Sequence, residues 1–256
     1  MILLLDVGNS NIKIGAVSND KIVKTWRIAT DLSKTADEFG LVFIELLESI
    51  GKKAKDVSGI IISSVAPSLN YTIEHMCEYY FNLSPIMVSH KINLGMNIIY
   101  SPPQDLGTDR IVNCVAAKQK YGYPCLIVDF GSATTFNLIS NKGDFIGGVI
   151  APGIKSSAEA LTNTAAKLPR IELSTPSSVV GISTVTNMQS GVIYGFRGLV
   201  EGIISLIKKE CGYSKLKVVA TGGMSEIIVA GGSTIFDTID RTLSLEGLKY
   251  LYKLNK

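Results

Sequence analysis

A pattern of residues that occurs twice constrains the fold of this chain more than any other feature. Near the start, the apolar run Ile2–Leu5 is followed by "DVGNSNIKIG" (Asp6–Gly15), and near the middle Leu126–Val128 is followed by "DFGSATTFN" (Asp129–Asn137). Each copy has the pattern of a buried strand that ends at an aspartate, a glycine two residues later, small polar residues and a second strand. Two copies, one near the start of each half, predict an internal duplication and therefore two similar lobes.

Apolar spacing along the rest of the chain predicts an α/β protein in which each half has a three-stranded meander, then helices and further strands. In the first half we expect strands at Ile2–Asp6, Ile12–Val17, Lys21–Ile28, Ser58–Val65 and 85–89, and helices at Thr35–Ile50 and Pro67–Phe81. In the second half we expect strands at Leu126–Phe130, Thr134–Ile139, Phe145–Ile150, Leu216–Gly223 and 234–239, and helices at Ile154–Lys167, Met188–Cys211, near Met224 and at Leu243–Leu254. We expect lobes at 1–108 and 109–256, joined by a helix around Asp109–Tyr121.

The polar residues after the first strand suit a phosphate-binding turn. Gly8-Asn9 predicts a tight turn, because both residue types tolerate positive φ. Turn N–H groups with Asn9, Ser10 and Asn11 are suited to donate to anionic oxygens. The Asp6 carboxylate suits a hydrated Mg²⁺ carried by nucleotide phosphates. A plain hairpin capped by an aspartate is the alternative interpretation.

Composition excludes several classes of protein. The chain has 256 residues, 46% of them hydrophobic and 18% charged, which is enough for a large core. A net charge of +3 without a long basic run does not favour a nucleic-acid binder. Asp6 interrupts the N-terminal apolar run, and no apolar stretch approaches the length of a membrane span, so we expect a cytoplasmic protein without a membrane partner. The scattered cysteines predict reduced thiols, and two histidines argue against a His-based metal site.

Six motifs follow one another along nearly the whole chain. They are "DVGNSNIKIG" (Asp6–Gly15), "YSPPQDLGTDR" (Tyr100–Arg110), "DFGSATTFN" (Asp129–Asn137), "GGVIAPG" (Gly147–Gly153), "TAAKLP" (Thr164–Pro169) and "TGG" (Thr221–Gly223). Together they resemble the type III pantothenate kinases, and "GTDR" is the most specific element. The resemblance implies a duplicated actin-like (ribonuclease H-like) fold. It also implies transfer of the γ-phosphoryl group of ATP to the hydroxyl of pantothenate, giving 4'-phosphopantothenate, the first step towards coenzyme A.

The two turns and "TGG" are expected to bind the nucleotide. The first turn, consisting of Asp6, Val7, Gly8, Asn9, Ser10, Asn11, Ile12 and Lys13, would hold the phosphates of ATP and Mg²⁺. Ser132 would be the polar contact from the second turn. Gly222 and Gly223 would let adenine or ribose lie against bare backbone, because glycine leaves room.

The "GTDR" segment is expected to bind the acceptor. Here Gly107 would allow close approach, Asp109 would accept the proton of the hydroxyl, and Arg110 would bind the carboxylate of pantothenate. The resemblance makes Asp109 the catalytic base and assigns substrate contacts to Tyr100, Gly107, Thr108, Asp109 and Arg110. A helix start, with Thr108 or Asp109 as its cap, is the alternative.

The resemblance also implies a monovalent cation, K⁺ or NH₄⁺, with Asp129 as its ligand. It implies a homodimer in which a threonine reaches the partner's substrate site. That threonine is Thr184, in "GIST" (Gly181–Thr184), where the family usually has Gly-Lys-Asn-Thr. The chain also has Ser132 where the family usually has threonine, and Asn137 where it usually has aspartate.

Two other functions are compatible with the two Asp-Gly turns. One is an actin-like kinase for another small hydroxy acid or sugar, which would keep Asp6, Asp129 and "TGG" but have a different acceptor pocket. The other is a non-catalytic regulator or filament protein that binds a nucleotide. Asp109 favours catalysis, because a binding module does not need a proton acceptor.

Overall fold

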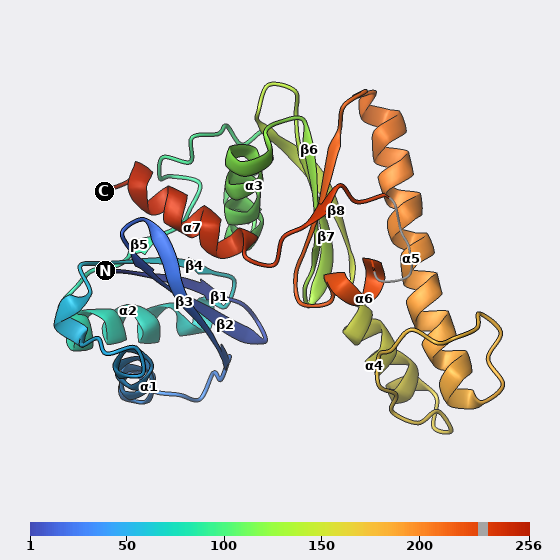
Figure 1. Cartoon of the computed structure of the whole chain (residues 1–256), viewed down its shortest axis with the longest axis horizontal. Coiled ribbons are helices and arrows are strands. Elements are labelled where there is room, and N and C mark those ends of the chain that lie inside the picture. The colour runs from blue at the N-terminus through green and yellow to red at the C-terminus, as the bar shows by residue number, and fades with distance from the viewer. Residues whose placement is uncertain (230–234) are drawn as a thin grey trace. The chain divides into compact units, whose positions relative to one another are not determined.

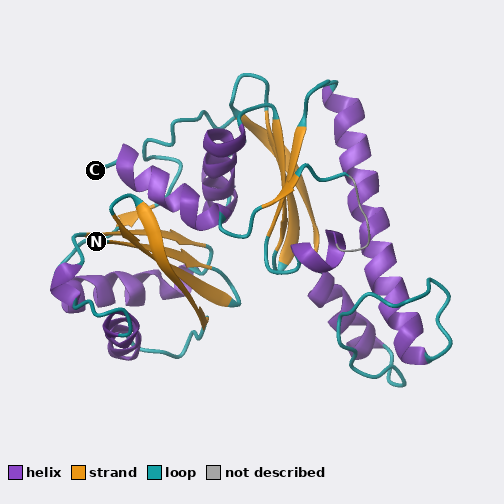
Figure 2. Cartoon of the chain, viewed as in Figure 1, coloured by secondary structure: helices purple, strands orange, loops and turns teal. Residues whose placement is uncertain are grey.

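The computed structural model describes residues 1–229 and 235–256 and contains two compact units, each with a five-stranded sheet (Figures 1 and 2). Unit 1 comprises Met1–Ala116 and Thr242–Lys256, and unit 2 comprises Ala117–Arg241. The chain therefore passes from one unit to the other within a helix and returns near its C-terminus. This division differs from the expected lobes 1–108 and 109–256, because the last helix packs with the first sheet.

The sheet of unit 1 has the order β3-β2-β1-β4-β5. Its strands are β1 (Ile2–Val7), β2 (Asn11–Ser18), β3 (Lys21–Ala29), β4 (Gly59–Ser64) and β5 (Ile86–Met87). The first three form an antiparallel meander, and β4 and β5 add in parallel beside β1. Parallel pairing needs crossover connections, which the intervening helices supply.

The sheet of unit 2 repeats this arrangement, with the order β8-β7-β6-β9-β10 when read from the meander edge. Its strands are β6 (Cys125–Phe130), β7 (Ala133–Ile139), β8 (Phe145–Pro152), β9 (Lys217–Thr221) and β10 (Thr238–Ile239). Again three antiparallel strands are followed by two parallel ones. The predicted duplication is therefore confirmed, strand for strand. The strand expected at 234–239 is shorter than predicted, and residue 234 lies outside the described residues.

Helices cover both faces of the first sheet. They are α1 (Ala36–Glu48) and α2 (Pro67–Phe81) on one face and α7 (Leu243–Leu254) on the other, with short 3₁₀ turns at Ala54–Asp56 and Pro103–Asp105. The first part of α3 (Thr108–Tyr121) packs against α7, where Val112 meets Gly247. The main core lies between β1, β2, β4 and the pair α1 and α2. On the opposite face, Leu245 of α7 packs against Leu4 and Gly15. Successive strand residues point to opposite faces, so the continuous apolar run of β1 contributes to both layers.

The described helices of unit 2 are α4 (Ile154–Thr164), α5 (Thr184–Cys211) and α6 (Ser225–Val229), together with the end of α3. Residues of α4, α5 and α6 form one core with β6, β7 and β9 (Figure 1). The helix α5 begins at a capping box formed by Ser183 and Thr186 and ends at Gly212, whose φ is +62°.

One described helix, α5, is long and apolar enough to cross a membrane, judged by length and composition alone. The sequence predicts no membrane span, because no uninterrupted apolar stretch approaches the required length. In the fold, one stripe of α5 (Val192, Ile193 and others) lies in the core of unit 2. This packing is typical of the core helix of a globular protein.

Candidate active site

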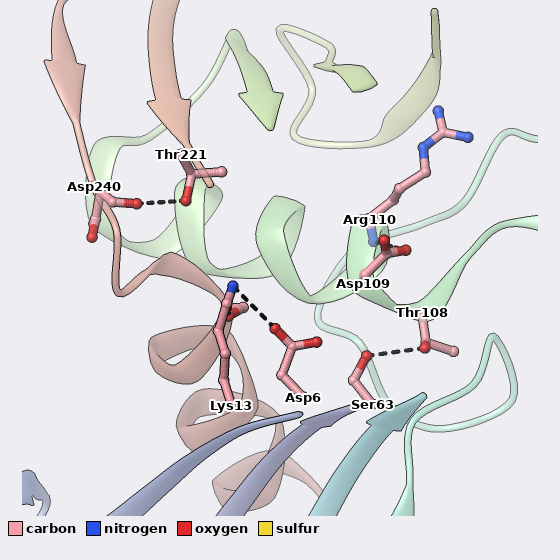
Figure 3. Close-up of polar contacts among 9 residues, drawn as sticks. Asp6, Lys13, Ser63, Thr108, Asp109, Arg110, Thr221 and Asp240 are labelled. Carbon is pink, nitrogen blue, oxygen red and sulfur yellow. Dashed lines mark hydrogen bonds and ion pairs between the residues drawn. The ribbon is translucent and has the colours of Figure 1, made fainter. Parts of the chain in front are cut away.

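The first feature of the site is a buried carboxylate near the end of β1. Asp6 is 8% exposed and lies opposite Lys13 in the β1–β2 register. The Lys13 Nζ is 3.4 Å from the Asp6 Oδ2 and donates to Ser244 Oγ of α7, also at 3.4 Å (Figure 3). A lysine and a carboxylate side by side at a strand end provide both a phosphate contact and a ligand for a phosphate-bound cation.

The turn after Asp6 is tight, but it is not built as the sequence suggested. Neither Gly8 nor Asn9 has a positive φ. The residues with a positive φ in this meander are Asn19 and Asp20, in the turn between β2 and β3. The Gly8 N–H donates to Asn11 O at 3.0 Å, so this donor is used within the hairpin. Gly8 is required by space, since a Cβ there would lie 3.0 Å from Asn11 O.

The remaining residues of this turn divide by exposure. Asn9, Ser10 and Asn11 are exposed at the tip, where a ligand could reach them. The side chains of Val7 and Ile12 are buried in the core of unit 1. Any contact of Val7 or Ile12 with a nucleotide would therefore involve the main chain.

A hydrogen-bonded chain of hydroxyls connects β4 with the start of α3. Ser63 is fully buried and pairs with Asp6 in the β1–β4 register. The Ser63 Oγ donates to Thr108 Oγ1 at 3.0 Å, and Thr108 Oγ1 donates to Ser64 O at 2.9 Å (Figure 3). Thr108 is the first residue of α3. This connection places "GTDR" at the same end of the sheet as Asp6.

Asp109 is the second residue of α3 and is partly buried beside Asp6. Its Oδ1 accepts the Arg110 N–H at 2.8 Å. Burial raises the pKa of the Asp109 carboxyl above its ordinary value of 3.8, and the negative charge of Asp6 raises it further. The Arg110 N–H and the Arg110 charge oppose the rise. A carboxylate with a raised pKa in a buried site is suited to accept a proton.

Arg110 and Tyr100 lie together beside this carboxylate. Arg110 is 6% exposed, and its guanidinium lies 5.8 Å from the centre of the Tyr100 ring. The guanidinium points away from Asp109 (Figure 3). An arginine held over an aromatic ring presents a fixed fork to a carboxylate ligand.

The helix-start interpretation of "GTDR" is compatible with this geometry. Asp109 lies in the first turn of α3 and accepts a main-chain N–H there, and a negative charge is favourable at this end of a helix. The Thr108 hydroxyl, however, donates to β4, as described above, and serves tertiary packing. The position of Asp109 in the first turn of α3 is therefore compatible both with a helix cap and with a catalytic base.

The second Asp-Gly turn, in unit 2, is one residue shorter than the first, and its aspartate has a different partner across the strand pair. Asp129 lies opposite Thr135 in the β6–β7 pair, where the first turn has Lys13. The Asn137 Nδ2 donates to Thr135 Oγ1 at 3.0 Å, and Asn137 is fully buried. Asp129, Thr135 and Asn137 therefore share one face of the second sheet. Three oxygen-bearing side chains on one face suit a hard cation.

Ser132 is exposed at the tip of the second turn, and its carbonyl accepts the Ser156 Oγ at 3.2 Å. A Cβ on Gly153, the last residue of "GGVIAPG", would collide with that carbonyl. The last glycine of this motif, which directly follows β8, is therefore explained by packing against this turn.

The two glycines of "TGG" have different roles. Gly222 has φ of +93°, and a Cβ there would collide with the Asp129 carboxylate and the Phe130 main chain. The sequence predicts that Gly222 leaves room for a ligand, but the space left by its missing side chain is filled by β6. Gly223 is exposed, with nothing within 4 Å of a Cβ. The bare backbone is therefore at Gly223. The preceding Thr221 is fixed through a bond from its Oγ1 to Asp240 O at 2.6 Å (Figure 3).

Thr184 is the first residue of α5 and is exposed. The capping hydrogen bonds of α5 use Ser183 and Thr186, so the side chain of Thr184 is not needed to start the helix. It is the only residue of the predicted site that lies at this end of α5.

Sequence reasoning missed several residues that hold the site. Ser63 and Ser244 were not predicted, because a serine at the end of a strand or the start of a helix has no distinctive local pattern. Gly153 was noted as part of a motif without a role. For Asp240, whose carboxylate accepts from Lys120 Nζ and Tyr121 OH at 2.6 and 2.7 Å, the sequence carries no signal.

The donor set fits ATP with a phosphate-bound Mg²⁺. The described residues contain no group of three or more His, Cys, Asp or Glu side chains able to hold a metal alone. One carboxylate at a glycine turn is what a Mg²⁺ needs when phosphates and water supply its other ligands. When bound, this cation would offset negative charge on the transferred phosphoryl group.

Comparison with known proteins decides the family. Residues 2–206 match the family model described as type III pantothenate kinase. The chain belongs to this family. A type III pantothenate kinase of Halalkalibacterium halodurans is 46% identical over 255 residues, covering 100% of both chains. One of Bacillus cytotoxicus is 48% identical, covering 100% of this chain and 97% of the relative. As a type III pantothenate kinase, the chain uses ATP to phosphorylate pantothenate in coenzyme A biosynthesis.

Solved structures confirm the actin-like fold of this pantothenate kinase. A Campylobacter jejuni protein, described as a conserved candidate of the Baf family of transcriptional activators, has a TM-score of 0.61 at 23% identity. The match covers 98% of this chain and 97% of that one. An inorganic polyphosphate/ATP-glucomannokinase of Arthrobacter has a TM-score of 0.51 at 11% identity, with 99% and 97% covered. At these identities the likeness concerns the fold alone.

The space around Gly107 gives a first test of the site. A Cβ at Gly107 would lie 2.6 Å from the Asp109 Oδ1, so Gly107→Ala must displace that carboxylate. We expect kcat to fall by about 10²-fold, the effect of misplacing a reacting group by roughly 1 Å. Steady-state kinetics will measure this, with Gln104→Ala, an exposed change in the same motif, as the control. A Gly107→Ala enzyme with the activity of the control would remove Asp109 from the reaction.

Proposed function

We propose that Asp109 is the general base of this pantothenate kinase and that Asp6 and Lys13 hold the phosphates and Mg²⁺ of ATP. The observation that supports this most strongly is the β1–β4–α3 connection. Ser63 lies beside Asp6 in the sheet and hydrogen-bonds to Thr108, next to Asp109. Phosphoryl transfer needs the acceptor hydroxyl and the phosphates to be placed together, and this connection joins the two groups within unit 1.

The acceptor would be bound by the rest of "GTDR". The Arg110 guanidinium, positioned over Tyr100, would take the pantothenate carboxylate by a bidentate pair. Gly107 and Thr108 would line the substrate through their main chain. The Asp109 carboxylate would then take the proton of the hydroxyl as its oxygen attacks the γ-phosphorus, and the proton would remain on Asp109 until product leaves.

Each Asp-Gly turn has exposed groups that would suit a nucleotide. In the first turn, the exposed side chains of Asn9, Ser10 and Asn11 would contact phosphate oxygens. In unit 2, Ser132 and the open backbone at Gly223 would contact the nucleotide. Gly222 would act by shaping the turn, as its packing against β6 indicates.

A monovalent cation, K⁺ or NH₄⁺, would be bound at Asp129. The neighbouring oxygens of Thr135 and Asn137 on the same sheet face support this site. The amide of Asn137 supplies no charge, so a site built on one carboxylate suits a singly charged ion.

The experiment that tests the function is an ATP-dependent assay with pantothenate in the presence of K⁺, with the product identified by its mass. We expect 4'-phosphopantothenate. A panel of other hydroxy acids and sugars, each at the same concentration, tests the alternative acceptors. Bound ATP without any phosphorylated product would favour the non-catalytic regulator.

We also propose that the enzyme is a cytoplasmic homodimer that associates through the exposed face of α5. Four glycines lie on this face, and a Cβ at any of them would meet open space: Gly191, Gly195, Gly198 and Gly202. Each costs a helix roughly 1 kcal/mol relative to alanine, a cost that close helix packing can offset. Ile182 and Val180, just before the helix, are 98% and 79% exposed. An apolar surface of this kind is typical of a covered interface.

Substitution of these glycines distinguishes an interface from a solvent-exposed helix by the sign of the effect. On a free helix, Gly195→Ala should raise the free energy of unfolding by about 1 kcal/mol. At a close helix contact it should weaken the dimer, and Gly195→Leu should produce monomers. Light scattering across a concentration series and urea denaturation will measure both. A wild type that is itself monomeric, or a stabilised Gly195→Ala protein that dimerises as tightly as the wild type, would contradict the interface.

Complementation tests whether Thr184 serves the partner's site. Asp109→Asn and Thr184→Ala proteins, each inactive alone, are mixed, dissociated and reassembled. If Thr184 acts across the dimer, a mixed dimer holds one intact site. About a quarter of wild-type activity should then return, because half of randomly reassembled dimers are mixed. No recovery, with mixed dimers confirmed by mass, would place Thr184 in its own subunit's site or outside the reaction.

A further inference from the structure

Arg197 is a buried charge within the apolar helix α5. Its exposed fraction is 9%, and its helix neighbours Ile193 and Val200 lie in the core of unit 2. A buried guanidinium needs hydrogen bonds or an opposite charge to offset its loss of water. No ion pair among the residues that the structure describes includes Arg197. Neutral acceptors therefore satisfy it.

Those acceptors are carbonyls of α6, the short helix beside α5 (Figure 1). The Arg197 Nε donates to Ile228 O at 2.9 Å, and its Nη2 donates to Ile227 O at 3.3 Å. The guanidinium also lies 5.3 Å from the centre of the Tyr194 ring. Carbonyls in the last turn of a helix lack intrahelical partners and carry partial negative charge, so a cation is favourable there. With only five residues, Ser225–Val229, α6 depends on such tertiary contacts.

The other end of α6 is attached to the "TGG" turn. The fully buried Ser225 donates from its Oγ to Gly222 O at 2.9 Å. Next to it, the Met224 N–H donates to Phe130 O at 3.4 Å, which ties the turn to β6. The helix is thus held at its start by the glycine turn and in its last turn by Arg197.

We propose that Arg197 is a positioning residue for the nucleotide. Through its two bonds to α6 it fixes the helix, and through Ser225 it fixes the backbone at Gly222 and Gly223. This inference rests on the proposed nucleotide contact of the "TGG" turn. It concerns ATP and not pantothenate, since α6 and the turn belong to unit 2, whereas "GTDR" belongs to unit 1.

Kinetics with each substrate varied separately test this role. For Arg197→Met, which keeps bulk and removes both donors, we expect the KM for ATP to rise at least about tenfold. The KM for pantothenate should stay within about twofold. Arg197→Lys keeps the positive charge but cannot donate both hydrogen bonds in the geometry of a guanidinium. Its KM for ATP should therefore lie between those of the wild type and Arg197→Met. Ile204→Val, two turns along the same buried stripe, is the control for loss of packing and should leave both KM values unchanged.

Two further measurements separate this inference from the role of the turn itself. Gly223→Val fills the open space at the turn and should raise the KM for ATP. If Gly223→Val has no effect, the nucleotide contact of "TGG" is wrong and the inference fails with it. If Gly223→Val raises the KM for ATP but a folded Arg197→Met protein does not, only the role of Arg197 is overturned. If Arg197→Met does not fold, the KM values of Arg197→Lys test the proposal instead. An equal rise of the KM for ATP and the KM for pantothenate would contradict the positioning role.

Discussion

Asp109→Asn is expected to lower kcat by about 10²–10⁴-fold, because the amide keeps the shape of the side chain but cannot accept the proton of the hydroxyl. ATP should still bind, and the dimer should remain. Asparagine is as good a helix cap as aspartate, so the helix-start interpretation predicts no loss of activity. One conservative variant therefore separates the two interpretations. Asp105→Asn, an exposed carboxylate in the same motif, is the matched control.

The raised pKa of Asp109 leads to two further expected results, one in the pH dependence of activity and one in the pH dependence of stability. Because the folded-state pKa is raised, kcat/KM of the wild type should fall as the pH drops through a value above the ordinary 3.8, and Asp109→Asn should lose this limb.

A carboxyl with a raised folded-state pKa binds its proton more tightly in the folded protein, so its ionised form costs stability at neutral pH. Asp109→Asn should therefore unfold at higher urea concentration than the wild type at pH 7, and the gain should shrink as the pH falls towards about 4. Near-wild-type turnover of a folded Asp109→Asn protein would end the assignment of the base.

Asp6→Asn should lower kcat/KM for Mg-ATP by about 10²–10³-fold, the cost of removing one electrostatic contact in a buried site. The change removes the charge that lies 3.4 Å from Lys13 and the carboxylate available to a phosphate-bound Mg²⁺. Raising the Mg²⁺ concentration should recover part of the activity, while the KM for pantothenate stays constant.

Asp20→Asn is the matched control for this variant, because Asp20 is also ion-paired in unit 1, with Lys253, but at the surface. Thermal unfolding of both variants should be compared before kinetics, since Asp6→Asn also leaves Lys13 without its carboxylate partner. If Asp6→Asn turns over at the rate of Asp20→Asn, then Asp6 does not contact the nucleotide complex, and Lys13 becomes the sole charged group of that turn.

Local patterns predicted most of the elements. Apolar runs such as Leu126–Val128 predicted the strands within one or two residues, except for the last one, because a strand buried on both faces must be continuously apolar. The helix expected at Thr35–Ile50 is found as α1, whose start is a capping box formed by Thr35 and Glu38. The expected helix at Leu243–Leu254 was found with the same bounds, yet its partner could not be foreseen. An amphipathic pattern fixes which face of a helix is buried, not which sheet it covers.

By itself, the sequence determined the duplication, the family and the order of the motifs, because these depend on which residues follow one another. The tertiary structure alone decided how the motifs are used. It placed Ser63 between Asp6 and Thr108, assigned Gly222 to packing and left Gly223 open, and set Arg197 against α6. These contacts join residues far apart in the chain, and their energies depend on distance and burial in three dimensions, which no local spacing of residue types encodes.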